Sequence, residues 1–122
     1  MSDTRGQAEA VLDSLVGKGV LGAGIVGRDG LPILLRFPRP VQEETFSAMT
    51  AALLGAAEAA LLELAEQGSA TVTVEAGGTR LAVAGLDDVH LLVVAAPAGL
   101  DAARLASSVA EGARSLQAVL RG

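Results

Sequence analysis

The chain has 122 residues, a length that fits one compact domain with an ordinary hydrophobic core. Its net charge of −5 and its two phenylalanines, without tyrosine or tryptophan, argue against a nucleic acid partner, because such binding needs clustered basic side chains and stacking surfaces. The absence of cysteine excludes disulfides, thiolate metal sites and cysteine nucleophiles.

Neither membrane insertion nor export is expected. Apolar residues make up 51% of the chain, yet Glu58 and Glu63 interrupt the longest apolar run before it reaches the roughly 20 residues of a spanning helix. The stretch Met1 to Gly6 lacks the basic start and apolar core of a secretory signal, so we expect a cytoplasmic protein. So much aliphatic surface in a small acidic protein indicates that some of it is buried against another chain.

The first predicted element is a helix from about Arg5 to Val16. Thr4 and Gln7 form a capping-box pattern before it, and Gly17 ends it. Four apolar residues recur at helical spacing and form its core stripe: Ala8, Val11, Leu12 and Leu15.

Two short strands are predicted next, at 23–27 and 33–36. They are joined by Asp29-Gly30, a strong signal for a hairpin turn. Turn chemistry explains Arg28 and its two neighbours in the turn, and a binding role for these residues is the alternative.

The same hairpin contains the pattern Gly22-x-Gly24-x-x-Gly27, which dinucleotide-binding sites use. Such a site needs a strand before the glycines and a helix that opens at them, so that the pyrophosphate meets free N–H groups. Here Asp29-Gly30 and Pro32 follow instead. We therefore expect no bound cofactor.

A long helix is predicted from about Gln42 to Gln67, after the extended connection that the prolines of 37–40 impose. Gly68 is its predicted stop. One apolar stripe consists of Phe46, Met49, Leu53, Ala57, Ala60 and Leu64. Further leucines widen the apolar surface beyond what one sheet face covers, so a second partner for this helix is implied. Its many alanines suit close approach of another helix, although high helix propensity explains them equally well.

Three further strands are predicted, at 71–75, 79–85 and 89–95, before a last helix at about 101–120. The first of these strands alternates, as a half-exposed strand does, whereas Leu91 to Val94 is apolar on both faces and is typical of a central strand. The last helix carries Leu105, Val109, Gly112, Leu116 and Val119 at helical spacing. The order is helix, two strands, helix, three strands, helix, which predicts an α+β fold in a single domain (1–122, core about 5–120).

Groups that carry catalysis are scarce in the sequence. His90 is the only histidine and lacks a sequence-local carboxylate pair, so we expect no catalytic or metal role for it. Asp87-Asp88 is interpreted as a turn, with cation binding as the weaker alternative. There is no Gly-x-x-x-x-Gly-Lys-Ser/Thr motif, so the chain is not itself a P-loop nucleotide hydrolase. We predict a protein that is not an enzyme and holds no metal.

Four segments together resemble the roadblock and dynein light chain family over nearly the whole chain. They are Val11 to Leu15, Ile25 to Ile33, Met49 to Gly55, and Leu91 to Val94. The hairpin and the Met-x-Ala-Ala-Leu-Leu segment are fairly specific in combination, whereas each alone is weak.

The resemblance implies a roadblock/profilin-like, three-layer sandwich with an antiparallel five-stranded sheet in the order 2-1-5-4-3. The outer helices would lie on one face, the long helix on the other, and the third strand at an exposed edge. Members of the family pair these edges and lay two long helices side by side. The implied homodimer interface is Thr71, Val72, Thr73, Val74 and Glu75 of the strand with Met49, Leu53, Ala56, Ala57 and Ala60 of the helix.

The function that the resemblance implies is that of a prokaryotic homodimeric regulator or adaptor, which binds a small Ras-like GTPase and modulates its nucleotide cycle. One alternative is a structural adaptor of a signalling or motility complex without a GTPase. A second alternative is a small-ligand sensor, against which the low aromatic content argues. No arginine is assigned a role in hydrolysis.

Overall fold

The computed structural model describes residues 3–38 and 40–121, so Arg39 in the predicted 37–40 connection lies outside the described residues. The elements follow the predicted order: α1 (Thr4–Gly17), β1 (Gly22–Gly27), β2 (Pro32–Arg36), α2 (Glu43–Glu63), β3 (Thr71–Ala76), β4 (Thr79–Gly85), β5 (His90–Pro97) and α3 (Ala102–Arg121).

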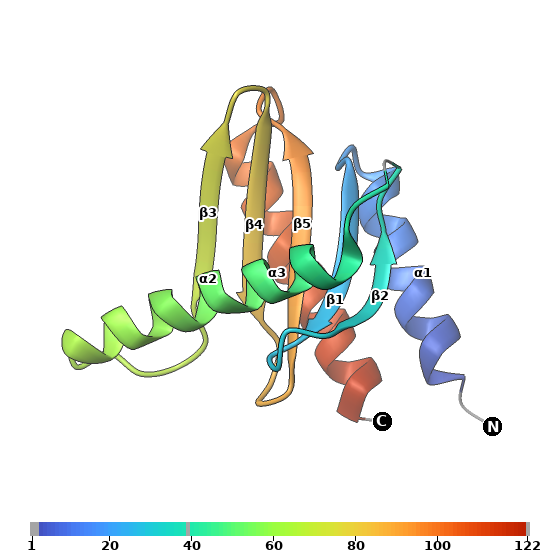
Figure 1. Cartoon of the computed structure of the whole chain (residues 1–122). Helices are drawn as coiled ribbons and strands as arrows, with labels where there is room; N and C mark the ends of the chain where they lie inside the picture. Colours follow the sequence, from blue (N-terminus) through green and yellow to red (C-terminus); the bar gives the residue numbers. More distant parts are fainter. Residues whose placement is uncertain (1–2, 39, 122) are drawn as a thin grey trace.

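The five strands form one antiparallel sheet in the order β2-β1-β5-β4-β3, as the resemblance implied. In Figure 1, α2 crosses one face of this sheet, and α1 and α3 lie on the other. The central position of β5 explains its composition, because both faces of Leu91 to Val94 are covered and all four residues are buried.

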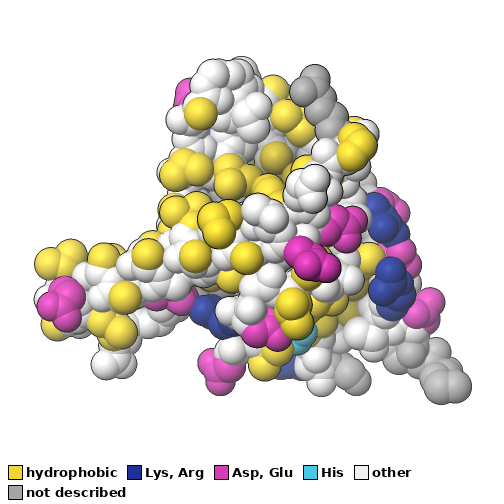
Figure 2. Space-filling view, in the orientation of Figure 1, with side chains coloured by type: hydrophobic (Ala, Val, Ile, Leu, Met, Phe, Trp, Pro, Cys, Tyr) yellow, Lys and Arg dark blue, Asp and Glu magenta, His cyan; other side chains and the backbone are white. Residues whose placement is uncertain are grey.

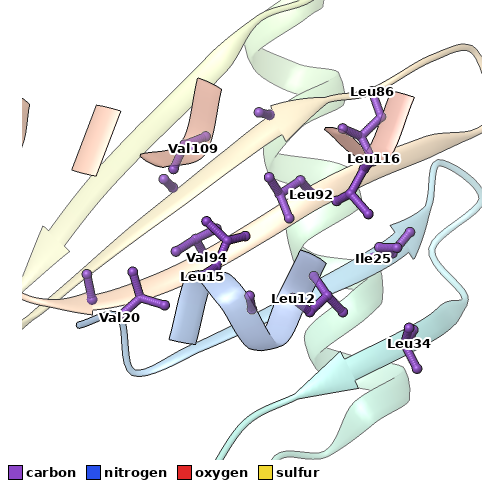
Figure 3. Packing of buried hydrophobic residues seen from close by; sticks show 14 of the residues in the cluster. Leu12, Leu15, Val20, Ile25, Leu34, Leu86, Leu92, Val94, Val109 and Leu116 are labelled. Atoms are coloured by element: carbon purple, nitrogen blue, oxygen red, sulfur yellow. The ribbon is translucent and has the colours of Figure 1, made fainter. Parts of the chain in front are cut away.

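The face under α1 and α3 holds the larger core. Figure 3 shows Leu12 and Leu15 of α1 and Val109 and Leu116 of α3 packed over side chains of the sheet, in one cluster. The helices approach closely at Gly112, where an added Cβ atom would lie 3.0 Å from a methyl group of Leu15. The predicted apolar stripes of both helices are thus confirmed as core.

The start of α1 differs from the predicted capping box. Asp3, not Thr4, is the N-cap residue, and its carboxylate accepts a hydrogen bond from the N–H of Gly6 at 3.0 Å. Thr4 is already inside the helix. Both residues are good N-caps, so the local pattern does not decide between them.

On the opposite face, α2 contacts the sheet only in part through the predicted apolar stripe. Its buried residues are Ser47, Thr50 and Leu54, whereas Met49 is 61% exposed and Leu64 is 72% exposed. An edge-to-face contact between Phe46 and Phe37, with ring centroids 5.2 Å apart, fastens the first turn of the helix. The predicted stripe is therefore divided: Phe46 and Leu53 pack against the core on this face, whereas other members are exposed, namely Met49, Ala60 and Leu64.

The helix also ends earlier than predicted, at Glu63 instead of near Gln67. The N–H of Ala65 donates to the carbonyl of Leu62, and the N–H of Glu66 donates to the carbonyl of Leu61. These two bonds close the chain in a Schellman motif, with Ala65 in the left-handed region at φ 62°. Glycine is the usual residue at this position, so the sequence pattern placed the end of the helix just before Gly68, too late in the chain.

The second half of α2 extends beyond β3 at the edge of the sheet (Figure 1). By length and composition alone, α2 could also cross a membrane, and 17% of its most apolar stretch is buried. The predicted interruption by Glu58 and Glu63 does not remove it from this class. This projecting half carries much of the apolar surface for which the sequence predicts a second partner.

Candidate interaction surface

The predicted interface strand, β3, lies at one end of the sheet order and pairs with β4. The N–H of Gly85 donates to the carbonyl of Ala70 at 3.2 Å, so these two residues form a hydrogen-bonded pair just below β3. Such pairs alternate along an antiparallel ladder. Thr71, Thr73 and Glu75 therefore direct their backbone N–H and C=O groups away from β4, toward the edge.

The side chains of β3 divide between the two faces of the sheet. Val72 packs with the cluster under α2, and Val74, two residues on, lies on the same face and is 43% exposed. Thr71 and Thr73 lie on the α3 face. Glu75 is held by its neighbour on β4, because Arg80 donates two hydrogen bonds to its carboxylate at 2.9 and 3.2 Å.

The predicted α2 residues share one flank of the helix, because their spacing repeats every three or four positions. Met49, Ala56 and Ala60 are exposed, and Leu53 and Ala57 are half-buried. Figure 2 shows this flank continuing into hydrophobic surface of the sheet beside it. The flank of α2 and the edge of β3 thus lie near one another, although Thr71 and Thr73 point to the opposite, α3 face of the sheet.

A hollow of about 460 Å³ opens where the first turn of α2 meets the sheet. It is lined by Leu21, Phe37, Pro38, Val41, Phe46, Thr79, Leu81 and Ala95. Since most of these side chains are apolar, the hollow extends the apolar surface from the flank of α2 onto the far end of β4 and β5.

The glycine pattern of the hairpin has a packing role. An added Cβ atom would lie 2.4 Å from the Phe37 ring at Gly22, 2.5 Å from the Leu35 side chain at Gly24 and 2.4 Å from the Asp29 carboxylate at Gly27. All three glycines belong to β1, and no helix opens after them. The turn chemistry predicted for Asp29-Gly30 is confirmed: Asp29 accepts the N–H of Leu31, and Gly30 has a φ of 89°.

His90 has a carboxylate neighbour that the sequence analysis did not expect. Its Nδ1 lies 2.9 Å from Asp87, which also accepts the N–H groups of Val89 and His90. Partial burial raises the pKa of Asp87, but these hydrogen bonds outweigh it and lower the pKa below its ordinary value. Asp87 thereby stabilises the β4–β5 turn. In the described part of the chain, no group of three or more His, Asp or Glu side chains lies close enough together to hold a metal ion.

The sequence predicted none of the ion pairs in the structure, and one of them joins the hairpin turn to α2. Arg28, predicted to serve the turn, donates to Glu58 of α2 through two nitrogens at 2.7 and 3.3 Å. A third nitrogen donates to the carbonyl of Asp87 at 2.6 Å. The side chains are only 27% and 22% exposed. Thirty positions separate the partners, and neither residue type nor spacing signals their contact.

A family model described as Roadblock/LC7 domain matches residues 7–96 of the chain. This match runs from the first turn of α1 through most of β5, and so includes the sheet edge and the whole of α2. A comparison with curated protein sequences gave no match.

Solved structures share the fold at low sequence identity. A Roadblock/LC7 domain from Streptomyces avermitilis is 23% identical, with a TM-score of 0.82 over 92% of this chain and 96% of that one. The gliding protein MglB from Thermus thermophilus is 16% identical, with a TM-score of 0.87 over 98% and 92%. Profilin II from Acanthamoeba castellanii is 20% identical, with a TM-score of 0.62 over 88% and 94%.

Proposed function

Because the chain belongs to the Roadblock/LC7 family, we propose that it is a non-enzymatic adaptor that forms a homodimer and regulates a small Ras-like GTPase. The observation that carries the proposal is the combination of an unprotected sheet edge with an apolar helix flank beside it. The strand has no proline, lysine or bulge that would discourage pairing.

The directions of the backbone groups of β3 determine the register in which two copies of this strand can pair. With Thr73 opposite its own copy, the outward-directed groups of Thr71, Thr73 and Glu75 all find partners across an antiparallel pair. Glu75 then faces Thr71 of the second copy, so two carboxylates do not oppose each other. The five predicted strand residues are all used in this register.

This pairing brings the two α2 helices onto one face. Antiparallel joining of identical edges places the two-fold axis perpendicular to the sheet, which keeps like faces together. Since α2 extends beyond β3 (Figure 1), each projecting half would then lie over the other copy. Met49, Ala56 and Ala60 would be covered there, together with Val74.

Regulation of the GTPase requires only differential binding. A dimer that binds one nucleotide state more tightly shifts the switch regions toward that state, without contributing a catalytic group. The paired α2 helices and the surrounding sheet provide a broad surface for such binding, whereas groups suited to nucleotide chemistry are scarce in the sequence.

Two measurements test the proposal. Sedimentation equilibrium should give the mass of a dimer for the wild-type chain and of a monomer for Thr73→Pro, which removes an outward-directed N–H but no bond to β4. Thr73→Val, which keeps the N–H and the side-chain shape, is the matched control and should remain dimeric.

The dimer should then be mixed with purified Ras-like GTPases of its own organism, loaded with GDP or with a non-hydrolysable GTP analogue. Calorimetry is expected to show binding that depends on the nucleotide. A dimer that binds neither state would contradict the GTPase proposal and favour the structural adaptor. A wild-type monomer would contradict self-association itself.

A further inference from the structure

The second half of α2 has little of its own to hold it against the sheet. The buried residues of the helix, Ser47, Thr50 and Leu54, all lie in its first twelve positions. From Gly55 to Glu63, every residue is exposed except Ala57 and Glu58, which are half-buried. The direction of this projecting half therefore depends on few contacts.

Glu58 supplies the principal polar contact. Its carboxylate accepts both terminal nitrogens of the Arg28 guanidinium, a planar two-point contact that fixes direction as well as distance. The N–H of Ala70, the residue directly before β3, also stabilises the charged carboxylate. Glu58 thus connects the projecting helix to the turn that follows β1, and the segment before the edge strand lies beside it.

Arg28 is itself held on several sides. Its N–H donates to the carbonyl of Val89 at 2.8 Å, and its Nε donates to the carbonyl of Asp87 at 2.6 Å. The guanidinium lies over Gly85, where an added Cβ atom would be 2.5 Å from it. Contacts with the end of β4 and with the β4–β5 turn therefore fix the position of the Arg28 side chain. Its contact with Glu58 in turn restrains α2.

We propose that the Arg28–Glu58 ion pair is a positioning element for self-association, which holds the second half of α2 at the angle that a second copy of the chain needs. This inference rests on the proposed function. The interface has two parts, the β3 edge and the α2 flank, and the pair joins elements next to both. Loss of the Arg28–Glu58 pair leaves the β3 edge intact but lets the second half of α2 change its direction. Ala57 and Ala60 then contact the second copy less often.

The test compares dissociation constants of the dimer, measured by sedimentation equilibrium well below the melting temperature. Glu58→Gln and Arg28→Met are expected to raise the constant roughly tenfold, which is what one hydrogen bond to a charged group is worth. Arg28→Lys keeps the charge but not the two-point geometry and should lie between them and the wild type.

Glu9→Gln is the matched control, because it breaks the similarly exposed Arg36–Glu9 pair on the α1 side of the sheet. It should leave the constant unchanged. Hydrogen exchange should accelerate between 55 and 63 in Glu58→Gln but not in β5. A pair that only stabilised the fold of the single chain would accelerate this exchange without raising the dissociation constant of the dimer.

Equal constants for the wild type, Glu58→Gln and Arg28→Met would overturn the inference and leave the proposed dimer standing. An equal rise in Glu9→Gln would overturn it as well, because the effect would then be general destabilisation. A wild-type monomer would remove the proposed function together with this role. If Arg28→Met does not fold, Glu58→Gln decides, since it keeps the size of the side chain.

Discussion

The face of the sheet under α1 and α3 buries sixteen described hydrophobic residues in one cluster, whereas the face under α2 buries six in its own cluster. On the first face, α1 and α3 pack against each other and against the strands. The apolar stripes predicted for both helices face this core. On the second, Met49, Leu64 and Val74 remain exposed. The first face is completed within the chain, apart from a hollow of about 530 Å³ between α3 and the β3–β4 edge, whereas the second face leaves large apolar side chains exposed.

The largest effect is expected on the completed face. Leu116→Ala removes a fully buried side chain between α3 and the sheet, and should lower the free energy of unfolding by about 3 kcal/mol. Urea denaturation measures this loss, which should be the same at low and high protein concentration. Leu62→Ala, at a position 58% exposed, is the control and should cost much less in dilute protein.

The next effect belongs to the open face and should depend on concentration. Met49→Glu places a charge on the exposed flank of α2, where the single chain tolerates it but a paired helix does not. We expect the dissociation constant of the dimer to rise about thirtyfold, or about 2 kcal/mol, with little change in the unfolding of dilute protein. Ala59→Glu, on an exposed position off this flank, should have a small effect. Equal effects of both variants would mean that the flank is not an interface.

The contrast between the faces also explains what the sequence predicted well. Turn signals are local, so the hairpin at Asp29-Gly30 and most strand limits were right to within one or two residues. The stripes of α1 and α3 were right because polar residues surround them. The order of the strands came from the family resemblance, since local patterns do not specify which edges meet.

The errors lie mostly on the open face. α2 is apolar on several sides, so periodicity did not separate the residues that contact its own sheet, such as Leu54, from those left for a partner, such as Met49. Its end was placed at Gly68 because an alanine at the left-handed position is unusual. The Arg28–Glu58 pair depends on tertiary structure, and no short-range rule brings these residues together.

A substitution at the end of α2 should have a smaller effect, and it should stabilise the protein instead of weakening it. Ala65→Gly relieves the left-handed conformation at the Schellman motif and should raise the free energy of unfolding by roughly 0.5–1 kcal/mol. Gly55→Ala, the reverse exchange inside the helix, should also stabilise by about as much, because an added Cβ atom meets nothing within 4 Å there. Thermal or urea unfolding measures both. Destabilisation by Ala65→Gly would contradict the observed cap.

The smallest effect concerns pH and the support of α2. The hydrogen bonds from Arg28 lower the pKa of Glu58 below its ordinary value of 4.5, against the opposing effect of burial. The charged groups around it are Arg28 at the end of β1, Asp87 and Asp88 in the β4–β5 turn, and Glu66 after α2.

A carboxyl whose pKa is lowered on folding stabilises the protein above its unfolded pKa, and this contribution is lost as the pH falls through the folded value. The difference in unfolding free energy between wild type and Glu58→Gln should therefore be constant near neutral pH and shrink below about pH 4.5. Urea titrations at several pH values measure it, and Glu9→Gln, whose pair lies on the completed face, controls for the general effect of acid. A difference that stays constant down to about pH 3 would show that Glu58 supports α2 by its shape and not by its charge.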